Sequence, residues 1–102
     1  DRREVREVNE HDVERKCVAI CRGLGLQLLK LRTPGWSGAP DRVLLLPRGI
    51  AVFFEMKCTG GKPRANQVSF HTWLRDLGFF VYVIDNPEDF RELVEDLIAQ
   101  PL

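Results

Sequence analysis

The 102-residue sequence lacks the features of membrane-spanning, secreted or zinc-stapled proteins. Its longest apolar runs, Val43–Leu46 and Ile50–Phe54, are far shorter than the roughly 20 residues of a membrane-spanning helix. The N-terminus is charged and lacks the apolar core of a secretion signal. Cys17, Cys21 and Cys58 are odd in number, and no second Cys/His pair stands at zinc-ligand spacing. We expect reduced cysteines in the core of a cytosolic protein with no membrane association.

The net charge of zero conceals an uneven distribution along the chain. Residues 26–75 carry eight Lys or Arg against two acids, whereas residues 76–102 carry seven acids against one Arg. The middle of the chain is therefore about +6 and its end about −6, while residues 1–25 balance. A polyanion would be attracted to the middle segment and repelled by the last one. Two solvated faces would explain the same pattern.

Hydrophobic periodicity and turn residues predict a single domain with the element order α-β-β-β-α-β-α. We divide the chain into a charged N-terminal segment (1–10), a domain (11–99) and a tail (100–102). Apolar spacing near three to four residues predicts helices, and short apolar runs between turn formers predict strands. Asn86 and Pro87 are typical of a helix start. The predicted helices cover 12–22, 65–77 and 87–98, and the predicted strands cover 26–31, 42–46, 50–57 and 79–84.

Three charged residues on the predicted hairpin form the strongest candidate site. Because side chains alternate across a strand, Glu55 and Lys57 share a face at the end of an apolar strand. Pairing around the turn 47–49 sets Asp41 roughly opposite Lys57 and close to Glu55. Two neighbouring carboxylates repel unless a cation lies between them, and such oxygen ligands suit Mg²⁺ or Mn²⁺. A cross-strand salt bridge would also account for the three residues.

The surrounding residues carry a resemblance to a known family. Gly38-Ala-Pro-Asp41, followed thirteen residues later by Glu55-Met-Lys57, resembles the PD-(D/E)xK nuclease signature. A polar glycine-containing loop, Gln67 at a helix start, and the run Leu74-Arg-Asp-Leu-Gly78 before a strand resemble its VRR-NUC branch, in small stand-alone phage or bacterial form. The resemblance spans about residues 12–98. It implies an α/β fold of the restriction-endonuclease type, with a mixed central sheet flanked by helices.

The resemblance also implies roles for individual residues. Asp41 and Glu55 match the metal-binding acids, and the backbone carbonyl of Met56 completes the set. Lys57 matches the catalytic lysine, and Gln67 matches a polar residue that touches phosphate or orders water. A further residue, Glu14 on the first helix, matches an acid that joins or supports the site.

Other residues are expected to contact DNA. The basic side chains and one tryptophan that lie near the site in the sequence are candidates for backbone contact or base stacking. Trp36 could equally anchor its loop on the core, and Trp73, at helical spacing with apolar residues, is interpreted as a core residue. Arg42 and Cys58 depart from the residue types usual next to the motif, and Arg42 is expected to point outward. The candidate contacts are Lys30, Arg32, Trp36, Arg42, Lys62 and Arg64.

The resemblance implies an Mg²⁺- or Mn²⁺-dependent DNA endonuclease that acts on branched, flapped or four-way DNA during repair or recombination. It implies a homodimer, since one site cuts one strand, located in bacterial or infected-host cytoplasm. A non-catalytic module that binds structured DNA on the same fold is the alternative. A plain scaffold protein would explain the hairpin but not the charge distribution.

Overall fold

The computed structural model describes residues 9–100, so the charged N-terminal segment expected over 1–10 falls mostly outside it. Three helices and four strands follow the predicted order α-β-β-β-α-β-α. A short 3₁₀ turn, Pro47–Gly49, joins the second and third strands. No helix among the described residues is long and apolar enough to cross a membrane. The elements are α1 (Glu10–Gly23), β1 (Leu28–Lys30), β2 (Arg42–Leu46), β3 (Ile50–Met56), α2 (Ala65–Asp76), β4 (Phe80–Ile84) and α3 (Pro87–Ala99).

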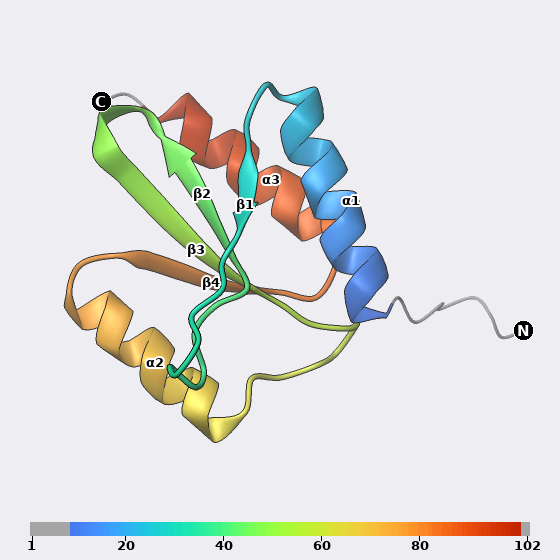
Figure 1. Ribbon diagram of the computed structural model, residues 1–102. Coiled ribbons are helices and arrows are strands. Elements are labelled where there is room, and N and C mark those ends of the chain that lie inside the picture. The colour runs from blue at the N-terminus through green and yellow to red at the C-terminus, as the bar shows by residue number, and fades with distance from the viewer. Residues whose placement is uncertain (1–8, 101–102) are drawn as a thin grey trace, which may run out of the picture.

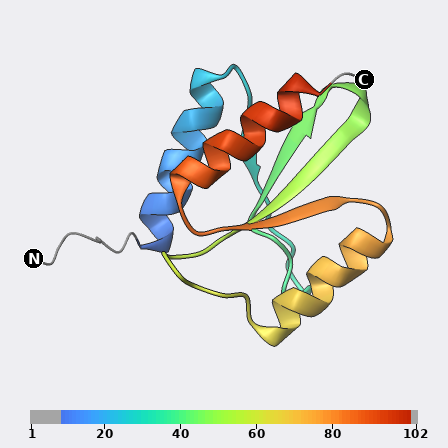
Figure 2. The ribbon, with the colours of Figure 1, turned by 180° about the vertical axis from the view of Figure 1, so that it is seen from behind.

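The four strands form one mixed sheet in the order β1-β2-β3-β4. β1, β2 and β3 are antiparallel neighbours, and β4 pairs with β3 in parallel after the crossover through α2. Helices α1 and α3 lie together on one face of the sheet, and α2 lies on the other face beside β4 (Figures 1 and 2). The mixed sheet flanked by helices confirms the expected fold class.

The hydrophobic core fills the space between the sheet and the pair α1/α3. Phe54 of β3 is its centre, with ring centroids 5.0 Å from Phe90 and 6.0 Å from Tyr82. Cys17 and Cys21 are fully buried there, as expected. Burial raises the pKa of the Cys17 thiol to about 12, so both cysteines pack as small neutral side chains. The expectation that all three cysteines lie in the core is wrong for Cys58, because it lies exposed in the loop after β3.

Capping residues fix where the first and last helices begin. The side chain of Asn9 accepts a hydrogen bond of 2.8 Å from the backbone N–H of Asp12, so α1 starts at Glu10, two residues before the expected start. Asn86 makes the same contact with Asp89, and Pro87 occupies the first position of α3, as predicted.

The buried face of α2 differs from the one expected. Its buried residues are Gln67, His71 and Leu74, spaced at four and three. Trp73, interpreted from the sequence as a core residue, is 51% exposed, and Val68 is also exposed. The physical reason is that α2 turns its polar stripe toward Glu55 of the sheet, so Val68 and Trp73 face outward.

The loop between β1 and β2 is docked on the first turn of α2. The side-chain amide of Asn66 donates a 2.6 Å hydrogen bond to the hydroxyl of Ser37. Gly38 has φ +91°, and its backbone lies so close to α2 that a β-carbon there would overlap the carbonyl of Asn66. Only glycine fits this position, for reasons of both backbone conformation and space.

This docking predicts unequal effects of two glycine substitutions. Gly38→Ala adds overlap with α2 to the strain of a positive φ, so we expect it to lower the free energy of unfolding by about 2–5 kcal/mol. Gly35→Ala is the matched control, because φ is +84° but nothing lies within 4 Å of the added carbon; it should cost only about 1–2 kcal/mol. Urea denaturation followed by circular dichroism measures both, and equal losses would contradict the docked loop.

Candidate active site

The β2–β3 hairpin brings Asp41 against Glu55. The register pairs Arg42 with Phe54, and the backbone N–H of Asp41 donates to the carbonyl of Phe54 at 3.1 Å. Asp41 therefore stands opposite Glu55, which corrects the expectation that it stands roughly opposite Lys57. The reason is the turn, because Leu46 pairs directly with Ile50 and leaves three residues between the strands.

Asp41 is held by the strand that carries the rest of the motif. One of its carboxylate oxygens, Oδ2, accepts a 2.9 Å hydrogen bond from the backbone N–H of Met56. The Met56 side chain points away from the site and is fully buried in the core. This bond fixes the direction of the Asp41 carboxylate relative to the end of β3.

Glu55 is the most enclosed charged group of the site, with 1% of its surface exposed. Its Oε2 accepts a 3.0 Å hydrogen bond from the Gln67 side-chain amide and lies 3.8 Å from the Lys57 ammonium nitrogen. Its Oε1 lies 3.6 Å from Nε2 of His71, and both atoms are buried without a hydrogen-bond partner. Half of this carboxylate is thus left unsatisfied in an apolar setting.

Burial and the negative charge of Asp41 together raise the pKa of Glu55 to about 8, against the opposing effect of Lys57. A carboxyl group with this pKa binds a proton at neutral pH unless a cation takes the proton's place. Lys57 is itself 7% exposed and directly follows β3, with its backbone N–H donating to the carbonyl of Ile84 at 2.8 Å. The two carboxylates, Asp41 and Glu55, therefore favour a positive charge beside them.

Two residues of α2 complete the wall of the site. Gln67 uses its carbonyl oxygen to accept a 2.8 Å hydrogen bond from the backbone N–H of Arg64, which leaves its amide for Glu55. His71 lies one helical turn further on and was not predicted. Its spacing of four residues from Gln67 would have been the available signal. Burial, together with the charge of Arg75, lowers the pKa of His71, so its ring is neutral.

Glu14 is not brought to the two acids. It binds the guanidinium of Arg42 at 2.7 Å and the ammonium of Lys30 at 3.1 Å. Burial alone would raise the pKa of Glu14, but these two hydrogen bonds outweigh burial and lower it. The α1 residue whose charge acts on Glu55 is instead Glu10, at the first position of the helix.

The donor set fits a hard divalent cation with an incomplete protein shell. Among residues 9–100, no three His, Cys, Asp or Glu side chains converge on one point. Asp41 and Glu55 supply two carboxylates, and the unsatisfied Oε1 of Glu55 is a vacant oxygen donor. Mg²⁺ and Mn²⁺ are bound in this way, with a few protein oxygens and the remaining positions taken by water or phosphate.

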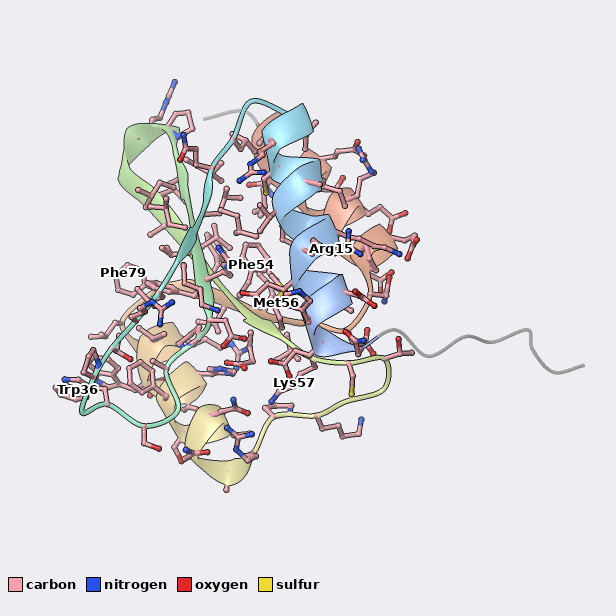
Figure 3. All side chains as sticks on the ribbon, turned by 45° about the vertical axis from the view of Figure 1, so that its right-hand side comes forward. Arg15, Trp36, Phe54, Met56, Lys57 and Phe79 are labelled. Carbon is pink, nitrogen blue, oxygen red and sulfur yellow. The ribbon has the colours of Figure 1, made fainter. Side chains whose placement is uncertain are left out.

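The residues expected to contact DNA fall into two groups. Arg42 and Lys30 are engaged by Glu14, and Arg42 also donates to the carbonyl of Leu28 at 3.1 Å. Arg42 therefore does not point outward as expected. It lies on the face of β2 that faces the core, so its side chain reaches Glu14 of α1. The exposed remainder are Arg32, Trp36, Lys62 and Arg64. Figure 3 shows Trp36 in the turn beside α2 and Lys57 at the end of β3.

Two acids and a lysine at a hairpin end, with a helix glutamine beside them, define the PD-(D/E)xK class of site. No family model matches the chain. "Putative nuclease p44" of Acyrthosiphon pisum secondary endosymbiont phage 1 is 36% identical over 84 residues, which cover 82% of this chain and 90% of that protein. A solved VRR_NUC domain has a TM-score of 0.73 at 31% identity, covering 84% of this chain and 94% of that one. The chain belongs to the VRR-NUC family.

The raised pKa of Glu55 predicts how the stability of the metal-free protein depends on pH. An acid whose pKa is higher in the folded state stabilises the fold below its unfolded value near 4.5 and loses that contribution as pH rises through about 8. We expect Glu55→Gln, which stays neutral, to remove this loss. The difference in unfolding free energy between variant and wild type should shift by roughly 3 kcal/mol in favour of the variant from pH 5 to pH 8, at about 1.4 kcal/mol per pH unit between the two pKa values.

Urea denaturation in EDTA at a series of pH values measures that difference, and titrating groups away from Glu55 cancel in the comparison. A difference that stays constant with pH would mean that Glu55 is already ionised in the metal-free fold.

Proposed function

We propose that this protein is an Mg²⁺- or Mn²⁺-dependent endonuclease that hydrolyses phosphodiester bonds in DNA. The observation that carries the proposal is the enclosed Glu55 carboxylate, with one oxygen unsatisfied, between Asp41 and Lys57. Such an arrangement destabilises the protein unless a cation is bound. The relative that covers 82% of this chain is named a putative nuclease, which supports the same activity here.

The chain's own residues have separable roles in this proposal. Asp41, Glu55 and the carbonyl of Met56 would hold the cation, which when bound lowers the pKa of a water molecule and offsets charge on the phosphate. Gln67 keeps Glu55 turned toward Asp41 by its 3.0 Å hydrogen bond. The Lys57 ammonium orients the attacking water or stabilises the negative charge that develops on the phosphate oxygens.

The substrate in this proposal is DNA with a branch, flap or four-way junction. Arg32, Lys62 and Arg64 are exposed in the two loops that border the site and can meet phosphates on either side of it. The described residues present no helix or ribbon of base-reading side chains, so recognition would follow DNA shape rather than sequence. The acidic outer face of α3 lies on the opposite side of the sheet from α2.

A non-catalytic module that binds structured DNA is the second candidate. It would use the same basic loops, but it would not need the Glu55 carboxylate, whose burial raises its pKa and destabilises its charged form. Since a Gln at position 55 would avoid that cost, the retained acid favours catalysis.

A cleavage assay separates the two candidates. Labelled linear, flapped and four-way DNA are incubated with Mn²⁺ and wild type, Lys57→Ala or the matched control Lys62→Ala. We expect wild type to cleave branched DNA best, Lys57→Ala to lose about 100-fold or more, and Lys62→Ala to lose only a few-fold. Absence of cleavage by wild type would reject the nuclease proposal. Full activity of Lys57→Ala would reject the assignment of the site.

We further propose that two copies associate through the sheet face that α2 leaves uncovered. Leu29, Val43 and Phe53 form one cross-strand row there, and Leu45 beside them is 56% exposed. A twofold interface places the same apolar patch on both copies, which suits a row without charges. Two sites in one particle could then cut two strands of a symmetric junction.

The dimer proposal predicts that one substitution in the interface converts the dimer to a monomer. Wild type should be a dimer by multi-angle light scattering, with and without DNA, and Leu45→Lys should be a monomer because a charge enters the apolar interface. Ile98→Lys is the control, since Ile98 is 45% exposed on α3 at the other face of the sheet. A monomeric wild type, or a dimer that tolerates Leu45→Lys, would contradict this interface.

A further inference from the structure

The two tryptophans of the chain are both exposed and lie in one depression. Trp36 is 67% exposed in the β1–β2 loop, and Trp73 is half exposed on α2. Together with Phe70 they line an open hollow of about 490 Å³. Trp73 and Phe70 pack edge to face, with ring centroids 5.4 Å apart at 87°, so the hollow has a fixed aromatic wall.

The position of Trp36 in this hollow is set by contacts already described. The turn that carries it is closed by a 3.0 Å hydrogen bond from its backbone N–H to the carbonyl of Thr33. The same loop is docked on α2 through Ser37 and Gly38, which meet Asn66. The aromatic faces are thus exposed while the backbone beneath them is held, and little ordering is required when a flat ligand binds.

The hollow lies on the helix that forms one wall of the proposed active site. Asn66, which lines it, directly precedes Gln67, whose amide binds Glu55. Trp73 is six residues beyond Gln67 on the same helix, about 9 Å along its axis at a rise of about 1.5 Å per residue. A DNA strand whose phosphate is at the site and whose next nucleotides run along α2 can therefore place a base over the hollow.

The chemistry of the lining suits an unpaired nucleobase. Its aromatic rings offer flat faces. Ser37 and Asn66 are hydrogen-bonded to each other, and the hydroxyl of Ser69, the O–H of Ser37 and the side-chain oxygen of Asn66 remain available to the hydrogen-bonding edges of a base. No acidic residue lines it, and exposed Arg64 precedes Asn66 by two positions, so a phosphate backbone is tolerated alongside. An apolar protein segment would cover these polar groups without offering them partners.

We propose that the Trp36–Phe70–Trp73 hollow is a stacking site for unpaired bases of a DNA strand, which selects substrates with a single-stranded arm. This inference rests on the proposed nuclease function and adds the reason for a preference for flaps and branches. Stacking on aromatic side chains is tolerant of base identity, because every base has a flat face. A continuous duplex has no base free to enter.

Intrinsic fluorescence tests the site directly, because the protein's only two tryptophans both line it. The full chain in EDTA is titrated with a single-stranded thymidine oligonucleotide and, separately, with a blunt duplex of equal length. We expect the single strand to quench the fluorescence at lower concentration than the duplex. By polarisation with a labelled oligonucleotide, Trp36→Ala should lose about tenfold or more in affinity, and Trp36→Phe should keep most of it.

The control is Leu77→Ala, which removes an exposed apolar side chain of the same region outside the hollow. Equal affinities of Trp36→Ala and this control, with both variants folded by circular dichroism, would overturn the stacking site. So would conversion of a dimer to a monomer by Trp36→Ala, which would assign the hollow to a second copy of the chain.

Cleavage is measured on flapped DNA with Mn²⁺ for the same variants. A tenfold loss for Trp36→Ala relative to Leu77→Ala supports the site. Cleavage by wild type without preferential quenching by the single strand rejects the stacking site and leaves the nuclease proposal intact. Preferential quenching without cleavage of any DNA by wild type rejects the nuclease proposal alone.

Discussion

The arrangement of the residues around the site depends on one energetically unfavourable feature, the burial of the Glu55 carboxylate at the end of an apolar strand. A buried carboxylate needs partners, and here they are Lys57 along the chain and Gln67 from the facing helix. Asp41 across the hairpin adds a second negative charge instead. Neither partner neutralises Glu55 fully, since its pKa is raised to about 8 and one oxygen has no partner. The fold therefore holds a site that a divalent cation and a phosphate would complete.

This constraint determines how α2 packs. A crossover helix on a sheet ordinarily buries its apolar stripe, but α2 buries Gln67 and His71 because they face Glu55. Its aromatic positions are turned outward, and Trp73 becomes available beside the docked loop that carries Trp36. The contacts of α2 with Glu55 and the exposed aromatic surface thus have a common physical origin, the rotation of one helix about its axis.

The features that could be predicted from the sequence are those set locally. Periodicity and capping residues predicted all seven elements, and Asn86 with Pro87 predicted the start of α3 to the residue. What depended on tertiary contacts was predicted less well. The register shifted Asp41 opposite Glu55, and the outward turn of α2 exposed Trp73. The resemblance implied that Glu14 joins or supports the site, but Glu14 forms ion pairs with Arg42 and Lys30. The charge of Glu10, one turn earlier, acts on Glu55 instead.

The pairing of Glu14 also narrows where DNA can lie. Lys30 and Arg42 both contribute to the positive charge of the middle segment, but neither is a free cation. A phosphate that bound Arg42 would have to displace a 2.7 Å ion pair in a half-buried setting, and one that bound the more exposed Lys30 would have to displace a 3.1 Å pair. The exposed cations that remain near the site, Arg32, Lys62 and Arg64, belong to the two loops that flank the ends of β2 and β3. The hollow under Trp36 adjoins the same loops. Phosphate contacts position a strand, and stacking engages only unpaired bases. Under the proposed function, this division would place the duplex and the single-stranded arms of a branched substrate on different parts of one surface, with the site between them.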